Sequence, residues 1–258
     1  MGAAILLAVV LIGMSLAATV VVYAASAGRR GDTGVEPLRG VGAAAAFLRE
    51  WLATIALLAA SLIGGRSNGI EPEARHVVIL VPERFCSIAT FWYLRRRLRG
   101  CGWSTRVAMA RTRTSDGREA ATVLDACTAA LPSGTEIVLL GHGIGGLVAH
   151  RYAQARPALR IRHVITLGTP HQGSRSLPYR LLGATAASAP PAAAGEAAVD
   201  VIAIYSDFDA WLVPVDDAYC PGGFNIAVRG IGHCAMLLSR RVGDLLVENL
   251  SSARSETA

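Results

Sequence analysis

The stretch Gly141-His142-Gly143-Ile144-Gly145-Gly146 decides the fold of this chain. A short apolar run with β-branched residues precedes it at 136–140, and runs of this kind are typical of strands buried in parallel sheets. An amphipathic segment follows it and ends at Pro157, a residue that cannot continue a helix. The sequence therefore predicts a sharp glycine-rich turn between a buried strand and a helix.

Glycine-rich turns of this type also bind dinucleotides, in which case the glycines follow the pattern G-x-G-x-x-G. Gly141, Gly143 and Gly146 meet that spacing only loosely. The acidic residue that such sites place about twenty positions further on is missing, because residues 160–163 read Arg-Ile-Arg-His. The pattern therefore disfavours a dinucleotide site, and no cofactor is expected.

Apolar runs alternate with amphipathic segments from residue 76 to residue 250, which predicts an α/β fold with a mainly parallel sheet and helices on both faces. The expected strands are 76–81, 105–110, 137–140, 164–167, 201–205 and 224–228. The expected helices are 88–100, 118–131, 146–156 and 235–249. Within 172–198, the Ala/Pro/Gly-rich stretch 183–195 suggests either a short cap or a plain surface connection.

Four ordered motifs resemble those of bacterial α/β-hydrolase lipases and esterases, the triacylglycerol-lipase-like group. Residues 141–149 are similar to their Gly-His-Ser-x-Gly-Gly-Leu-Val-Ala nucleophile turn, and 164–174, 204–214 and 232–237 resemble later motifs in the same order. The resemblance implies the α/β-hydrolase fold, with Asp209 as the triad acid and His233 as the triad base. It also implies that the backbone N–H of Ile144 is an oxyanion-hole donor. Taken singly, Asp209 also suits a turn residue and His233 a core histidine.

Two departures from that pattern oppose catalysis. Gly143 stands at the nucleophile position, so no hydroxyl is present there. Pro82 and Glu83 replace the His-Gly of the oxyanion loop, and Glu83 brings a carboxylate to a place where negative charge must be stabilised. Arg84 is a candidate oxyanion-side cation that would partly offset it, and the alternative is an exposed Glu83–Arg84 salt pair. We therefore expect a catalytically impaired pseudo-hydrolase.

Other nucleophiles keep the enzyme question open. Cys86 and Cys234 lie near the expected site, and activation of a water by His233 and Asp209 in place of the missing serine is a further alternative. Glycine at position 143 also relieves the strain that a serine suffers at positive φ, so we expect Gly143→Ser to lower the melting temperature.

The composition excludes several function classes. All 25 basic residues are arginine and the formal net charge is +6, but no nucleic-acid motif accompanies this charge. The basic stretch 94–99 suits either an anionic membrane surface or a solvated helix face. The five cysteines show no metal-ligand spacing, so no metal is expected.

The first 75 residues predict membrane attachment. Residues 1–28 carry no charge and are long enough to cross a hydrocarbon core of roughly 30 Å as a transmembrane anchor. Ala25-Ser26-Ala27 resembles a signal-peptide cleavage site, but Arg29 and Arg30 favour an anchor in a bacterial inner membrane. A second apolar segment, 41–65, is either a returning or an interfacial helix, followed by a linker at 66–75. A returning helix would put the domain 76–250 and the tail 251–258 on the periplasmic or exterior side, and an interfacial one would leave them cytoplasmic.

The leading hypothesis is thus a membrane-anchored pseudo-hydrolase that binds a lipid, an acyl-ester ligand or a protein partner. An active lipase or carboxylesterase with an atypical mechanism is the first alternative. A purely structural membrane scaffold is the second.

Overall fold

The computed structural model describes residues 2–27, 38–63, 74–83, 86–109, 118–159, 161–174, 176–181 and 199–255. Six parallel strands form one sheet in the order β2-β1-β3-β4-β5-β6. The strands are β1 His76–Val81, β2 Ser104–Val107, β3 Glu136–His142, β4 Ile161–Leu167, β5 Asp200–Ser206 and β6 Phe224–Val228. The predicted α/β class with a parallel sheet is confirmed.

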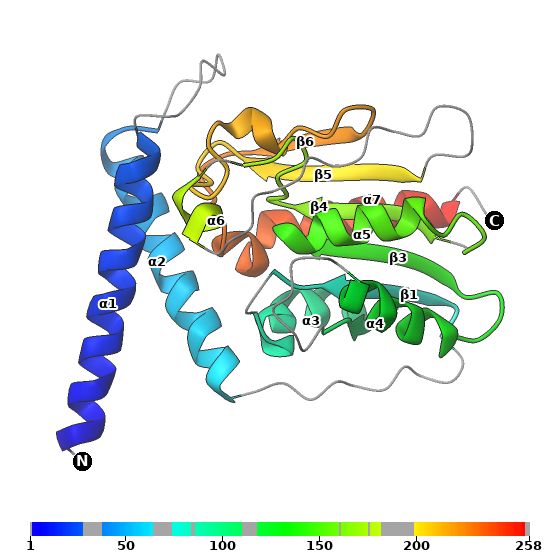
Figure 1. The fold of residues 1–258 in the computed structure, drawn as a ribbon, viewed down its shortest axis with the longest axis horizontal. Coiled ribbons are helices and arrows are strands. Elements are labelled where there is room, and N and C mark those ends of the chain that lie inside the picture. The colour runs from blue at the N-terminus through cyan, green and yellow to red at the C-terminus, as the bar shows by residue number, and fades with distance from the viewer. Residues whose placement is uncertain are drawn as a thin grey trace.

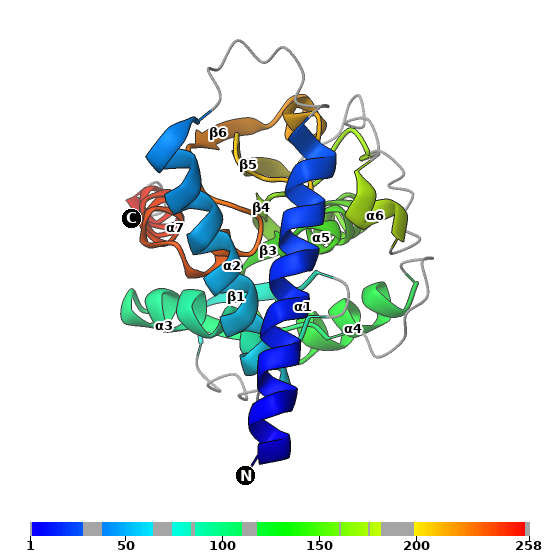
Figure 2. The same ribbon diagram turned by 90° about the vertical axis from the view of Figure 1, so that its left-hand side faces the viewer.

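Helices cover both faces of the sheet, as the end-on view in Figure 2 shows. The helices that follow the first strands are η1 Ile88–Phe91, α3 Trp92–Gly100, α4 Arg118–Ala129, α5 Ile144–Gln154 and α6 Leu177–Leu181. The later ones are η2 Val215–Ala218, η3 Ala235–Leu238 and α7 Arg240–Ser255. Side chains of α3 and α7 pack on one face of the sheet, and those of α4 and α5 pack on the other.

Alternate residues of each central strand explain this arrangement. In β1, Val78 and Leu80 enter the core beneath α3 and α7, whereas Val77 and Ile79 enter the core beneath α4 and α5. Both sets are buried, so the strand is apolar throughout rather than alternating with polar residues. The apolar runs in the sequence reflect this burial on two sides.

The predicted element boundaries need small corrections. The predicted helix 88–100 consists of η1 followed by α3, and the predicted helix 235–249 consists of η3 followed by α7. The strand predicted to reach residue 110 ends at Val107. Most of the predicted cap at 172–198 lies outside the described residues, apart from 172–174 and 176–181.

The N-terminal segments form two helices, α1 Gly2–Ala27 and α2 Gly40–Ile63, which lie beside each other across the end of the sheet in Figure 1. Among the described residues, Gly40–Leu62 is long and apolar enough to cross a membrane, and Ile12–Ala25 is a shorter apolar helix. Large apolar side chains on both helices are exposed, including Met14, Val41 and Leu62. Membrane insertion stays a prediction.

Helix α2 is attached to the α/β domain through a buried acidic side chain. Glu50 is 3% exposed, and its two carboxylate oxygens accept hydrogen bonds from the backbone N–H groups of Cys234 (2.9 Å) and Ala235 (2.8 Å). On α1, the Tyr23 hydroxyl donates a hydrogen bond of 3.0 Å to the carbonyl oxygen of Phe208. Both helices therefore contact loops that follow β5 and β6.

The basic stretch 94–99 is not a uniform charged surface. Leu94, Arg95 and Leu98 are buried, and the Nε of Arg95 donates to the Thr105 hydroxyl at 3.4 Å. Arg97 forms an ion pair with Asp244 of α7. Only part of this segment is available to a membrane surface or to solvent.

Candidate active site

The site lies at the point where the strand order of the sheet reverses, between β1 and β3. The chain continues from β1 to β2 on one side and reaches β3 on the other, so β1 and β3 are adjacent, with Val81 opposite Gly141. Ligands of open α/β sheets bind in the crevice at the carboxyl ends of such strands. Glu83 follows β1 here, and Gly143 follows β3.

The turn after β3 has the backbone of a nucleophile elbow. Gly143 has φ 54° and ψ −126°, and α5 begins at the next residue. A Cβ on Gly145 would overlap the backbone oxygens of Val81 and Pro82, so only glycine allows α5 to start this close to β1. The predicted strand–turn–helix is therefore present, with residue 143 at its tip.

The structure brings Asp209 and His233 together at the same end of the sheet. Asp209 follows β5 and His233 follows β6, and the Asp209 Oδ2 lies 2.8 Å from the His233 Nδ1. The other Asp209 oxygen accepts a hydrogen bond of 2.8 Å from the backbone N–H of Trp211. The Trp211 ring stacks on the imidazole with ring centroids 4.8 Å apart and an interplanar angle of 10°. This arrangement orients an imidazole as a triad does, and the catalytic role of the pair stays a prediction.

Glu83 occupies the centre of the site. Its Oε2 accepts a hydrogen bond of 3.0 Å from the backbone N–H of Ile144, the predicted oxyanion donor. The same oxygen lies 3.6 Å from the His233 Nε2, and the Tyr179 hydroxyl donates to it at 3.4 Å. A Cβ built on Gly143 would overlap this oxygen. One carboxylate oxygen of Glu83 therefore occupies the space where the side chain of a nucleophile at residue 143 would lie. The same oxygen accepts the hydrogen bond that the Ile144 N–H would donate to an oxyanion.

Glu83 is only 4% exposed, so the interpretation of this residue as half of an exposed salt pair is wrong. Arg84, the predicted oxyanion-side cation, lies outside the described residues. The histidine supplies positive charge instead, because His233 lies between Glu83 and Asp209.

This arrangement changes the protonation of the imidazole. Burial alone lowers the pKa of His233, but the carboxylates of Asp209 and Glu83 outweigh it and raise this pKa to about 10. Next to it, burial and the charge of His233 lower the pKa of His142 to about 4. The raised pKa favours a protonated His233 at neutral pH, and the lowered pKa favours a neutral His142 beside it.

The two candidate cysteine nucleophiles are deactivated. Burial, followed by the charge of Glu83, raises the pKa of the Cys86 thiol to about 12. Burial also raises the pKa of the Cys234 thiol well above its ordinary value, and Glu50 adds to this effect. A thiol nucleophile needs a lowered pKa, so the environment contradicts this alternative. All five cysteines are free thiols.

Several residues of the site have no clear signal in the sequence. Glu50 lies in an apolar helix, 184 positions before Cys234 in the sequence. Its carboxylate nevertheless accepts hydrogen bonds from the backbone directly after His233. Tyr179 contacts Glu83, and the His142 ring contacts the His233 ring. Nothing in the sequence around either residue indicates these contacts. The acidic side chain of Glu50 within a mostly apolar helix is the signal in the sequence that could have indicated a buried polar contact.

Glu83, His142 and His233 could in principle hold a metal ion, because one donor atom from each lies within 4.8 Å of the other two. A metal would have to displace the His233 proton and also compete with the Ile144 N–H for the Glu83 oxygen. The geometry fits an ion pair better than a metal centre.

Comparison with known proteins gives the fold of the chain. No protein-family model and no curated protein matches it. Among solved structures, MGS-MChE2, an α/β hydrolase from the metagenome of Mar Chica lagoon sediments in Morocco, is 14% identical, with a TM-score of 0.55 over 73% of this chain and 98% of that one. The metagenomic carboxyl esterase MGS0156 is 16% identical, with a TM-score of 0.51 over 72% and 78%.

A third similar structure is the RedJ thioesterase of the prodiginine pathway in Streptomyces coelicolor, 16% identical with a TM-score of 0.51 over 74% of this chain and 95% of that one. The fold of the chain is thus that of the α/β hydrolases. At these identities the comparison establishes the fold alone.

Proposed function

We propose that this chain is a membrane-attached pseudo-hydrolase, a lipase/esterase-like α/β hydrolase without serine catalysis that binds an anionic lipid. The observation that carries the loss of catalysis is the position of Glu83. Its carboxylate takes the oxyanion donor of Ile144 and fills the space beside Gly143.

Three properties of the site oppose acyl transfer. No hydroxyl is present at residue 143. The Ile144 N–H already binds a carboxylate, so it is not free to stabilise a developing oxyanion. With a pKa raised to about 10, His233 is protonated at neutral pH and cannot act as a general base.

A double substitution tests this proposal. Gly143→Ser combined with Glu83→Gly would supply the hydroxyl and remove the carboxylate from the oxyanion hole. We expect short-chain ester hydrolysis by the double variant, and none above background by the native chain or by either single variant. Adding His233→Ala to the double variant should abolish the activity. Hydrolysis by the native chain that is lost in His233→Ala would overturn the proposal.

That last outcome is the signature of the alternative function, an active hydrolase with an atypical mechanism. The proximity of Glu83 to His233, 3.6 Å between Oε2 and Nε2, is the observation in its favour. A carboxylate and an imidazole at that separation could activate a water together. The mechanism requires Glu83 to leave the Ile144 N–H, and Glu83→Gln should then abolish hydrolysis as completely as His233→Ala.

A cavity of about 780 Å³ supports the proposed lipid ligand. It lies between α2 and the segment from β6 to α7, and its apolar lining includes Leu52, Ile231 and Leu238. Arg49, Arg229, Arg240 and Arg241 also line it. Apolar walls with arginines suit an amphiphile with a negative headgroup, because arginine binds phosphate through paired N–H donors.

Vesicle binding tests the ligand. The purified chain should bind phosphatidylglycerol vesicles more strongly than phosphatidylcholine vesicles, and Arg240→Gln with Arg241→Gln should reduce this preference. Arg96→Gln with Arg99→Gln removes the same amount of charge from α3. This control variant should keep most of the preference for phosphatidylglycerol vesicles. Equal loss in both double variants would contradict a specific cavity and indicate attraction by net charge alone.

Attachment to a bacterial inner membrane by α1 and α2 is part of the proposal, with the hydrolase-like domain on the periplasmic or exterior side. Its support is the length of the apolar helix α2 and the exposed apolar side chains of both helices. A C-terminal alkaline phosphatase fusion, active only outside the cytoplasm, should be active. An inactive fusion at normal abundance would place the domain in the cytoplasm.

A further inference from the structure

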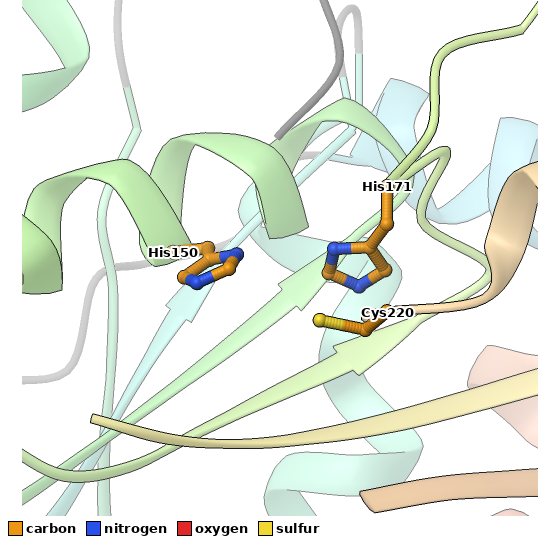
Figure 3. A group of neighbouring side chains, drawn as sticks. All are labelled: His150, His171 and Cys220. Carbon is orange, nitrogen blue, oxygen red and sulfur yellow. The ribbon is translucent and has the colours of Figure 1, made fainter. Parts of the chain in front are cut away.

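A second cluster of buried titratable side chains shares no residue with the candidate active site. His150 comes from α5, His171 from the loop after β4, and Cys220 from the connection between η2 and β6. Figure 3 shows the His150 ring turned toward His171, with the Cys220 sulfur beside the His171 ring. The three residues are 6%, 1% and 2% exposed.

Each imidazole has one ring nitrogen bound and one without a partner. The Nε2 of His171 lies 2.9 Å from the Thr166 hydroxyl, and the Nε2 of His150 lies 3.1 Å from the side-chain amide of Gln154. The Nδ1 atoms of His150 and His171 are buried and have no hydrogen-bond partner among the residues that the structure describes. Buried polar atoms are nearly always satisfied, so two such nitrogens beside one thiol form a candidate ligand-binding set.

We infer that His150, His171 and Cys220 bind a Zn²⁺ ion through the two Nδ1 atoms and the Cys220 sulfur. One donor atom from each residue lies within 4.8 Å of the other two. Tetrahedral zinc, with Zn–N of about 2.0 Å and Zn–S of about 2.3 Å, needs donors about 3.3 to 3.6 Å apart. Small side-chain rotations would close that difference.

The donor set selects the metal. Two imidazoles and a thiolate suit zinc, whereas calcium and magnesium require oxygen ligands. The outer contacts also fit, since metal-bound histidines usually donate their second N–H to a neighbouring group. The Thr166 hydroxyl can accept from His171, and the Gln154 amide accepts from His150 when its oxygen faces the ring.

The lowered pKa of His171 suits its role as a neutral ligand, whereas the Cys220 thiol must lose its proton to bind zinc. Burial and the charge of His150 lower the pKa of His171 to about 3, so its ring is neutral over the physiological range. Burial raises the pKa of the Cys220 thiol to about 11. Zinc binding therefore displaces one proton from Cys220 to solvent, and the affinity should rise with pH.

Such a site would join three segments that meet near the candidate active site. It links the elbow helix α5, the loop that follows β4 and the chain entering β6. Three protein ligands leave one coordination position for a water molecule. Metal binding should therefore stabilise the packing of α5, the loop after β4 and the chain entering β6 against one another.

The first experiment measures zinc in the full-length chain after purification in detergent, incubation with Zn²⁺ and dialysis. We expect about one zinc per chain for the native protein and a loss for Cys220→Ser. Cys127→Ser is the matched control, because Cys127 is a buried cysteine of the same core outside this cluster. Thr166→Val should weaken the affinity by about 10- to 100-fold. Equal zinc content in Cys220→Ser and the native chain would overturn the assignment.

Cobalt substitution separates this site from the cluster of Glu83, His142 and His233. Of these two clusters of described residues, only the proposed site contains sulfur, so Co²⁺ bound there should give a thiolate charge-transfer absorption in the near ultraviolet. If Cys220→Ser fails to fold, the native chain still decides the matter. Its melting temperature should rise with Zn²⁺ and fall with a chelator. Absence of the cobalt–thiolate band in the native chain would contradict the proposal.

Discussion

The Glu83 Oε2 lies where the side chain of residue 143 would begin, and it accepts the hydrogen bond of the Ile144 N–H at 3.0 Å. The two departures from the lipase pattern are therefore a single structural change. A side chain from the loop after β1 fills the space that glycine opens at the elbow after β3.

This relationship predicts the effect of restoring serine alone. Gly143→Ser should lower the melting temperature, because a side chain at φ 54° is strained and its Cβ also meets Glu83. Backbone strain of about 1 to 3 kcal/mol corresponds to a fall on the order of 2 to 12 °C. Differential scanning calorimetry is the measurement.

The matched control for this substitution is Gly222→Ser. Gly222 has φ +76°, and a Cβ there meets no atom of the described residues within 4 Å, so serine at this position carries backbone strain without the clash. A Gly143→Ser fall no larger than that of Gly222→Ser would show that Glu83 yields without cost.

The proton on His233 predicts a pH dependence on the alkaline side. Its pKa is raised to about 10 in the folded chain, above the usual value near 6.5. The contribution of the protonated ring is therefore complete below about pH 6.5 and is lost as the pH rises toward 10. Thermal melts from pH 6 to 10 should show the stability of the native chain falling relative to that of His233→Asn.

Glu83→Gln provides a second measure of the same interaction. Removing the Glu83 charge should lower the pKa of His233, because only the Asp209 carboxylate remains beside the ring. Titration of the imidazole by NMR would measure the shift. An unchanged pKa would mean that Glu83 does not interact electrostatically with this histidine.

His142 predicts the opposite trend in acid. Burial and the charge of His233 lower its pKa to about 4, so its neutral form stabilises the fold above about pH 6.5. That contribution should be lost as the pH falls from about 6.5 toward 4. His142→Asn should reduce the slope of melting temperature against pH in this range. A slope equal to the native one would contradict the pKa assignment.

The buried carboxylate of α2 predicts a structural role for Glu50. Glu50→Ala leaves the N–H groups of Cys234 and Ala235 without their acceptors. Each unsatisfied buried group costs about 1 to 3 kcal/mol, so the chain should melt at a lower temperature and α2 should be cut faster by protease. Glu248→Ala, at an exposed site on α7, should change neither property. Identical behaviour of the two variants would show that α2 does not depend on Glu50.

Local patterns in the sequence were sufficient for the fold and for part of the site. Apolar runs mark strands buried on both faces, and the glycines at 141, 145 and 146 define the elbow because a Cβ there would overlap neighbouring backbone or Thr169. Parallel strands all end at one edge of the sheet, so residues that follow β3, β5 and β6, such as Gly143, Asp209 and His233, lie at that edge. The resemblance to ordered lipase motifs, together with the position of each residue at the end of a predicted strand, thus predicted their proximity.

Only the tertiary structure decided what Glu83, Glu50 and the cluster of His150, His171 and Cys220 contact. Each of these contacts joins segments that are far apart in the chain, and no period or spacing encodes such a distance. The position of the Glu83 carboxylate depends on how the loop after β1 turns toward α5. The pairing of Glu50 with the loop after His233 depends on where α2 packs. Interactions of single side chains are set by packing, and packing appears only when the whole chain is folded.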